Sequence, residues 1–226
     1  MFKKPTLLNK DEHKNLKIAP MTHYKHARGL NYVPIAMNEV SEACKHYPVF
    51  FLKESDGTVL PFIVLGLKEG ENKIVNKSGE WRKGRYIPAL CRAYPFILSK
   101  NDDNFSVAFD AEYDGLNAKD GERLMTDAGE MSEFGQKVVK FLEELYSNLE
   151  GTKNLAKVLD EMELLKQVDA TIEQNGEKFV LAGLLQVDSE KLNKLNDEQI
   201  LKLAKTGALN LSYAHLMSLT NFQNLV

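Results

Sequence analysis

Two short turns constrain the fold of this chain more than any other feature of its sequence. Asp56-Gly57 interrupts the largely apolar residues 49–65, and Asn175-Gly176 interrupts residues 168–187. Asp-Gly and Asn-Gly favour tight hairpin turns, because such turns need residues that tolerate a positive φ. Each turn therefore predicts a pair of antiparallel strands.

The two predicted hairpins resemble each other in sequence. The first ends in Val64-Leu65-Gly66-Leu67 and the second in Leu181-Ala182-Gly183-Leu184. An internal duplication would place two related hairpins in one sheet. The simpler explanation is convergence, because Asp-Gly and Asn-Gly are the favoured residues of such turns. Both interpretations stay open at this point.

Further elements follow from local signals. A short helix is expected over residues 38–46, because the residue before Pro48 is driven out of the helical region. Residues 66–84 are rich in glycine and predict a loop. Residues 94–98 and 105–109 predict two more strands, joined by the turn Asn101-Asp102-Asp103-Asn104.

The pattern changes to helical periodicity after about residue 125. Apolar residues then recur at steps of three and four, as on one face of an amphipathic helix: Phe134, Val138, Phe141, Leu142, Leu145 and Leu149. Asp127 and Glu130 have the spacing of a capping box, and Gly151 interrupts the pattern before it resumes. Residues 188–203 and 211–225 predict two more helices, separated at Gly207.

These elements predict an α+β fold: a mainly antiparallel sheet built from hairpins, with amphipathic helices packed on one face. Residues 1–28 are polar and predict a partly irregular N-terminal arm, with regular structure beginning near Leu30. Residues 29–226 are expected to form a single domain, which is long enough to bury a substantial core.

Charge and hydropathy exclude several classes of partner. The net charge is −3, and no apolar run approaches the roughly 18–20 residues that span a bilayer. We therefore expect no nucleic-acid partner and no membrane span. The first residues, MFKKPTLLNKDEHKN, lack the apolar core of a signal peptide. A cytoplasmic location is expected, with the cell surface reached by leaderless export as the alternative.

The sequence contains no recognisable catalytic motif. A P-loop, GxGxxG, GxSxG, HExxH and CxxC are all absent, so we expect no metal and no cofactor, and the chain is more easily interpreted as a non-enzyme. Cys44 and Cys91 are 47 positions apart and predict buried free thiols. An enzyme with a dispersed site would escape these motif searches.

Histidines offer two candidate sites. His23 and His26 have a spacing compatible with one metal ion, but they lie in a polar segment and are interpreted as solvated residues of the arm. His215 and Ser218 share a face of the last predicted helix. His215 is either a half-buried structural residue bonded to a hydroxyl or a carbonyl, or a proton carrier.

The densest segment of the sequence is GENKIVNKSGEWRKGRYIPALCRAYPFIL, residues 70–98. Basic and aromatic side chains alternate there, a combination that binds phosphate, carboxylate or sugar. The alternative is a loop whose Trp81 anchors onto the core while its charges face water. The binding candidates of the chain are Asn72, Trp81, Arg85, Tyr86, Arg92, Tyr94 and His215.

Several motifs of this chain together resemble the SapC family of bacterial proteins. The resemblance covers about residues 20–225 and is carried by Tyr47-Pro48-Val49-Phe50-Phe51, Gly79-Glu80-Trp81, Tyr86-Ile87-Pro88-Ala89, Arg92-Ala93-Tyr94-Pro95-Phe96, Gly207-Ala208-Leu209 and Tyr213-Ala214-His215-Leu216. The resemblance implies an accessory protein associated with a paracrystalline surface layer. It supplies no chemical role for any single residue.

Two functions follow as hypotheses. The first is a non-enzymatic accessory or surface-layer-associated protein that binds a protein or glycan partner through residues 81–92. The second is an enzyme or cofactor-dependent accessory protein with a dispersed site, using His215, Arg92 or Tyr94 on a small molecule. The oligomeric state is not indicated by the sequence.

Overall fold

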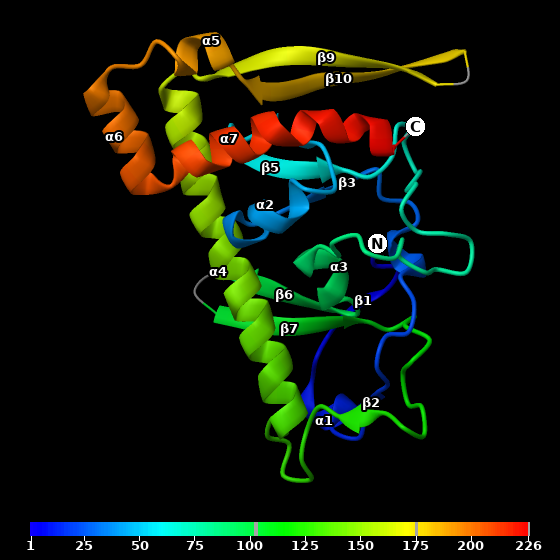
Figure 1. Ribbon diagram of the computed structural model, residues 1–226. Coiled ribbons are helices and arrows are strands. Elements are labelled where there is room, and N and C mark those ends of the chain that lie inside the picture. Colours follow the sequence, from blue (N-terminus) through cyan, green and yellow to red (C-terminus); the bar gives the residue numbers. More distant parts are fainter. Residues whose placement is uncertain (102–103, 175, 226) are drawn as a thin grey trace.

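A twisted five-stranded antiparallel sheet forms the centre of one half of the molecule, drawn at the top of Figure 1. The computed structural model describes residues 1–101, 104–174 and 176–225. The strands lie in the order β3 (Tyr32–Pro34), β5 (Val59–Val64), β4 (Val49–Lys53), β10 (Glu177–Val187) and β9 (Leu165–Gln174).

Both predicted hairpins form, and they lie in the same sheet. In the first, β4 and β5 pair from Val49 opposite Ile63 to Lys53 opposite Val59, and Gly57 adopts a φ of +85° in the turn. The second consists of β9 and β10, with Asn175 of its turn outside the described residues. The two hairpins meet at β4 and β10, where Phe51 lies opposite Leu185. A duplication stays a hypothesis.

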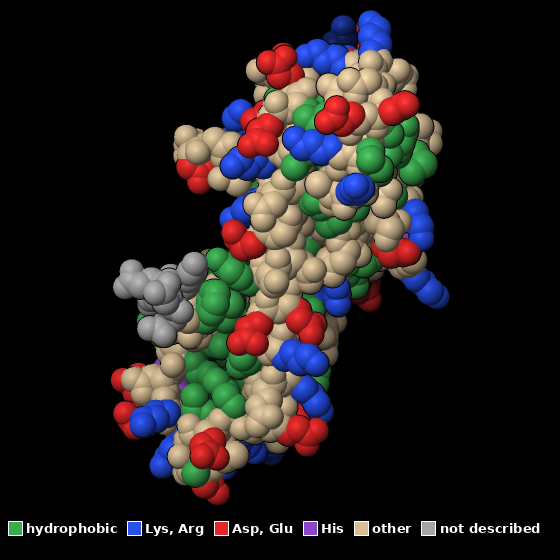
Figure 2. Space-filling model, turned by 90° about the vertical axis from the view of Figure 1, so that its left-hand side faces the viewer, with side chains coloured by type: hydrophobic (Ala, Val, Ile, Leu, Met, Phe, Trp, Pro, Cys, Tyr) green, Lys and Arg blue, Asp and Glu red, His purple; other side chains and the backbone are tan. Residues whose placement is uncertain are grey.

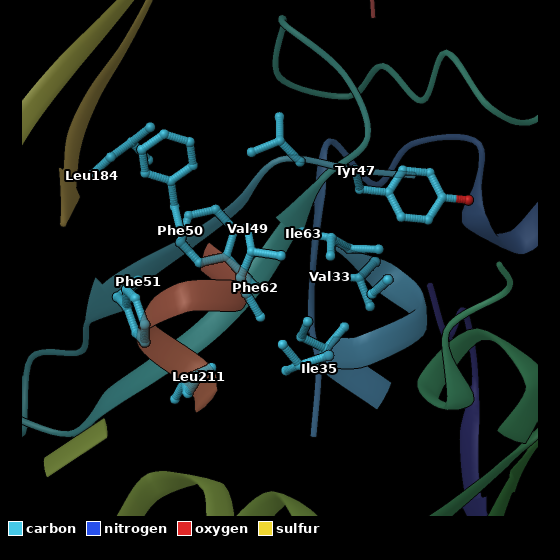
Figure 3. Packing of buried hydrophobic residues seen from close by; sticks show 14 of the residues in the cluster. Val33, Ile35, Tyr47, Val49, Phe50, Phe51, Phe62, Ile63, Leu184 and Leu211 are labelled. Carbon is cyan, nitrogen blue, oxygen red and sulfur yellow. The ribbon is translucent and has the colours of Figure 1, made fainter. Parts of the chain in front are cut away.

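Helices cover this sheet. The structure thereby confirms the predicted α+β class. The long helix α4 (Glu133–Glu161) contacts β5, and α7 (Ala208–Ser218) contacts β4 and β10, while α2 (Met37–Ala43) contacts both helices. Figure 3 shows the core between these layers, with Phe51 close to Leu211 of α7 and with Phe50 directed toward Leu184.

A second hydrophobic cluster occupies the other half of the molecule. A three-stranded sheet in the order β1 (Pro5–Leu7), β7 (Asn104–Asp110) and β6 (Phe96–Asn101) lies beside the first half of α4. The short elements α1 (Lys10–His13), β2 (Lys17–Ile18), α3 (Ala89–Ala93) and β8 (Glu122–Arg123) complete this half. Leu142 and Leu145 of α4 belong to this cluster, whereas Ala156 and Leu159 belong to the first.

The expectation that regular structure begins near Leu30 was wrong. β1 pairs with β7, with Thr6 opposite Phe109, and the 3-10 helix η1 (Lys25–Ala27) follows β2. Three apolar residues of this polar segment are buried: Leu16 and Ile18 pack in the second cluster and Ala27 packs in the first, whereas Leu7 is exposed.

The long helix differs from its predicted form at two positions. It continues through Gly151, which is exposed, because the turns on either side pack against the core. Its N-cap is Ser132, whose hydroxyl accepts a hydrogen bond from Gly135 N at 3.0 Å, and not the predicted capping box of Asp127 and Glu130. Asp127 instead forms an ion pair with Arg123.

The C-terminal helices are shorter than predicted. Residues 188–203 were expected as one helix but form α5 (Ser189–Leu192) and the start of α6 (Asp197–Thr206), because Asn196 caps a new helix through Gln199 N. Gly207 ends α6 at a φ of +87°, as expected. The last predicted helix consists of α7 and the 3-10 helix η2 (Leu219–Asn224). Of the turn at residues 101–104, Asp102 and Asp103 lie outside the described residues.

Candidate functional site

Trp81 anchors the dense loop to the core. Its side chain is only 8% exposed, and its Nε1 donates a hydrogen bond to the Tyr47 hydroxyl at 3.0 Å. That hydroxyl donates in turn to the carbonyl of Tyr86 at 2.6 Å. In Figure 3 the Tyr47 hydroxyl points away from the other labelled residues of the cluster. The indole therefore fixes the loop and presents little surface to a ligand.

Asn72 has a similar fixing role at the start of the loop. It is buried, and its Nδ2 donates to the carbonyl of Ala27 at 2.9 Å. Its Oδ1 accepts from the backbone N–H groups of Ile74 and Val75. Through these bonds the Asn72 side chain connects the backbone at Ala27 to the backbone at Ile74 and Val75.

A buried carboxylate that the sequence did not single out organises residues 86–92. Glu39 of α2 accepts hydrogen bonds from the Tyr86 hydroxyl at 2.9 Å and from the Ala89 N–H at 2.7 Å. Burial and the negative charge of Glu39 raise the pKa of Tyr86 to about 12. Arg92 donates to the Tyr86 hydroxyl at 3.4 Å and to the carbonyl of Ile87 at 3.1 Å.

His215 lies between two strands. Its Nδ1 donates to the carbonyl of Val49 at 2.6 Å, and its Nε2 accepts from the N–H of Val187 at 3.2 Å. Ser218 donates to the carbonyl of His215 and accepts from the Val49 N–H. The imidazole is fully buried, and burial lowers its pKa to about 4. Both ring nitrogens are thus engaged by the backbone.

Tyr94 belongs to an aromatic and polar cluster in the second half of the molecule. Its hydroxyl donates to Asp110 at 3.0 Å, and its ring stacks on His26 with the centroids 4.0 Å apart. The interpretation of His23 and His26 as solvated residues was wrong. His26 is half-buried, and burial lowers its pKa to about 4, while His23 contacts Asp114 at 2.8 Å.

A groove of about 880 Å³ lies between α2 and α7. Six of its twelve lining residues are apolar: Met37, Val40, Cys44, Tyr213, Ala214 and Met217. Tyr213 is 48% exposed and Met217 is 65% exposed. Of the two predicted buried thiols, Cys91 is buried, whereas Cys44 is half-buried and lines this groove.

Hydrogen bonds connect the groove to the basic part of the dense loop. Arg85 donates to the side-chain oxygen of Asn224 at 3.2 Å, and Asn224 donates to Asn221 at 2.9 Å. Asn221 lines the groove and donates to the carbonyl of Cys44 at 2.7 Å. Arg82 and Lys83 lie next to Arg85 and are exposed. We call this groove together with Arg82, Lys83 and Arg85 the groove–loop surface.

Three cations of the groove–loop surface lack a carboxylate partner among the described residues, whereas Lys45, which lines the groove, pairs with Glu42 at 2.6 Å. Within the part of the chain that the structure describes, no ion pair involves Arg82, Lys83 or Arg85. Arg82 instead donates to the carbonyl of Asn224. Burial and the positive charge of Arg85 lower the pKa of His46, at the end of α2. The surface can therefore receive negative charge beside an apolar groove.

The structure thus separates the sequence-predicted binding residues. Arg85 lies at the groove–loop surface, and Trp81 and Tyr86 lie behind it. Arg92 and Tyr94 line a different pocket, while Asn72 and His215 are interior. Sequence reasoning missed Tyr213 and Met217, whose only signal is two large apolar residues at a helical spacing of four.

Among the described residues, no group of three or more His, Cys, Asp and Glu side chains is arranged to hold a metal ion. No helix in the same residues is both long and apolar enough to cross a membrane. Figure 2 shows acidic and basic side chains interspersed over one face, with hydrophobic side chains gathered beside them in its lower half.

Comparisons with known proteins give one match. The family model described as SapC matches residues 8–225, nearly the whole chain. No curated protein and no solved structure is detectably similar to it.

Proposed function

Because the chain belongs to the SapC family, we propose that it acts as a non-enzymatic accessory protein that binds a protein partner at the groove–loop surface. The family resemblance favours a setting associated with a bacterial surface layer. One observation carries the proposal: a groove that exposes Tyr213 and Met217 is connected through Asn221 and Asn224 to basic side chains that form no ion pair among the described residues.

The chemistry of this surface defines the partner. Tyr, Met and Arg are enriched at protein interfaces, and Met adapts its shape to different apolar groups. The groove is suited to apolar side chains of a helix or loop, and the basic residues are suited to Asp or Glu at the end of that segment. We therefore propose a partner segment that is apolar along its length and acidic at one end.

A protein partner is favoured over a glycan. Sugar rings stack on exposed aromatic faces, but Trp81 is 8% exposed and its Nε1 is already bonded to Tyr47, while the exposed ring of Tyr213 is accompanied in the groove by the aliphatic side chains of Val40 and Met217. A dispersed active site with His215 as proton carrier has less support. A backbone N–H occupies the acceptor nitrogen of that ring, and a backbone carbonyl occupies the other.

Photo-crosslinking in cells that naturally make the protein tests the proposal. A photoreactive residue at position 217 lies in the groove, whereas one at Leu201 of α6 is a matched control, since Leu201 is also exposed, by 52%, and lies outside it. We expect a discrete protein adduct from position 217 and none from position 201. Mass spectrometry then identifies the partner and the segment attached.

Charge reversal distinguishes a specific partner from incidental capture. Arg82→Glu with Lys83→Glu should remove most of the adduct at position 217, and added salt should weaken it, because exposed charges are screened. Lys205→Glu is the matched control, as Lys205 is exposed on α6. Equal adducts from positions 201 and 217, or an adduct unchanged by the double reversal, would contradict the proposal.

A further inference from the structure

A second cavity lies beside the first half of α4, away from the groove–loop surface. Its volume is about 300 Å³. Residues from three segments line it: 18–21, 92–96 and the α4 stripe that carries Phe134, Val138 and Phe141. The stripe side chains are only half-buried, so this apolar surface is open to a ligand. Such a volume is at the small end of ligand pockets.

Arg92 lies at the wall of this cavity in a fixed position. Its Nε donates to the carbonyl of Ile87 at 3.1 Å, one Nη donates to the Tyr86 hydroxyl at 3.4 Å, and its guanidinium lies 5.7 Å from the Phe141 ring centroid. No ion pair among the described residues involves Arg92. It therefore keeps N–H donors for an incoming anion.

The other polar groups of the cavity are already engaged. The Tyr94 hydroxyl donates to Asp110, and Lys137 forms an exposed ion pair with Glu133 at 2.9 Å. The cavity thus combines an apolar interior with one pre-positioned guanidinium that forms no ion pair among the described residues; Glu39 bonds to the Tyr86 hydroxyl that Arg92 also contacts. A guanidinium binds a carboxylate through two parallel hydrogen bonds, and its fixed position reduces the entropy lost on binding.

We infer that this cavity binds a small monocarboxylate with an apolar body, such as a medium-chain fatty acid. The chain of the acid lies against Phe134, Val138 and Phe141, and its carboxylate lies on Arg92. The inference is independent of the proposed protein partner, because the two surfaces share no lining residue.

Titration of the ¹⁵N-labelled full chain with octanoate tests the inference, with 1-octanol as the uncharged probe of the same length. We expect saturable NMR shifts in amides of residues 92–96 and 134–142. Octanoate should bind at least about tenfold more tightly than 1-octanol, since its carboxylate accepts charge-assisted hydrogen bonds from Arg92, which are stronger than hydrogen bonds between neutral groups.

Substitutions distinguish the contribution of the Arg92 charge to binding from the contribution of the apolar cavity. Arg92→Met should weaken octanoate binding at least about tenfold and leave 1-octanol within about twofold, while Arg92→Lys should give an intermediate loss because it keeps the charge without the fork. Val138→Phe fills the cavity and should abolish both interactions. Lys140→Met is the control cation, because Lys140 is exposed on α4 and does not line the cavity, and it should change neither by more than about threefold.

The inference is overturned by any of three results. One is the absence of saturable shifts at residues 92–96 and 134–142 in the wild-type chain. Another is equal affinity for octanoate and 1-octanol. The third is octanoate binding that Arg92→Met leaves unchanged. The amide spectrum of each variant shows directly whether it is folded, and Arg92→Lys provides the comparison if Arg92→Met is not.

Discussion

The side chain of His215 completes the backbone hydrogen bonding where β4 and β10 separate. In the register that places Phe51 opposite Leu185, Val49 lies opposite Val187. Their backbone groups do not meet; instead the imidazole of His215 accepts from Val187 N–H and donates to the Val49 carbonyl. An unpaired buried backbone group costs about 1–3 kcal/mol. His215 therefore joins β4 to β10 and attaches α7 to both.

Replacement of His215 should change the pH dependence of stability. The folded protein holds His215 neutral with a pKa of about 4, whereas the unfolded chain has the ordinary value of 6.5. The unfolded state therefore binds more protons between these values, and stability falls as the pH falls from about 6.5 toward 4. Protonation of His215 alone therefore lowers the free energy of unfolding by about 2–3 kcal/mol at pH 4.5.

We expect His215→Asn to be less stable at pH 7.5 by about 1–3 kcal/mol, because Val187 N–H loses its acceptor. Its loss between pH 7.5 and 4.5 should be smaller than that of the wild type by about 2–3 kcal/mol. Urea unfolding at the two pH values measures both quantities. His26 keeps its own depressed pKa and leaves a residual slope in the variant. An unchanged acid loss in His215→Asn would contradict this role.

The candidate residues could be found from the sequence, but their roles could not. Trp81 and Tyr86 stand out by composition, yet each is fixed by a partner distant in the chain. Trp81 bonds to Tyr47, 34 positions away, and Tyr86 bonds to Glu39, 47 positions away. Such pairings depend on how α2 packs beside the loop. Glu39 has no local signal, because a buried carboxylate and a solvated one look alike in a sequence.

Among the elements, α4 shows how packing overrides local propensity. Gly151 lies inside the helix, and a Cβ there would meet no atom within 4 Å. Glycine in a helix interior costs about 0.5–1 kcal/mol relative to alanine. That cost is small beside the burial of Ala156 and Leu159 in the following turns. Periodicity located this helix, but its continuation depended on contacts far away in the chain.

Gly151→Ala should therefore stabilise the protein by about 0.5–1 kcal/mol. Gly135 is the matched control in the same helix, because a Cβ there would lie 2.3 Å from the carbonyl oxygen of Leu124. Gly135→Ala should destabilise. Thermal unfolding of both variants measures the two signs. A helix that ended at Gly151 would give no gain from the first substitution.

The strands followed more directly from the sequence than the helix ends did. Turns at Asp56-Gly57 and Asn175-Gly176 predicted both hairpins, because turn chemistry is local. The order of strands was not predictable in the same way. It rests on the long-range contact of β4 with β10, which includes the pair Phe51 and Leu185 and the bridge through His215.

At the scale of the whole molecule, one helix joins two hydrophobic clusters. Leu142 and Leu145 of α4 are buried in one cluster, and Ala156 and Leu159 are buried in the other. Melting of either cluster would leave half of a continuous helix without its apolar contacts. Most helical stability in proteins comes from such packing. We therefore propose that residues 29–226 unfold as one unit, together with the N-terminal strands.

Leu142→Ala tests this coupling, because Leu142 lies in one cluster and the single tryptophan, Trp81, lies in the other. A buried Leu→Ala change costs about 2–5 kcal/mol. If α4 couples the clusters, the substitution should lower the urea midpoint of unfolding by the same amount whether it is followed by Trp81 fluorescence or by far-UV circular dichroism. Leu159→Ala, within the first cluster, should shift both probes together as well. A fluorescence midpoint that stays at the wild-type value in Leu142→Ala, with two steps in the dichroism, would show two independent units.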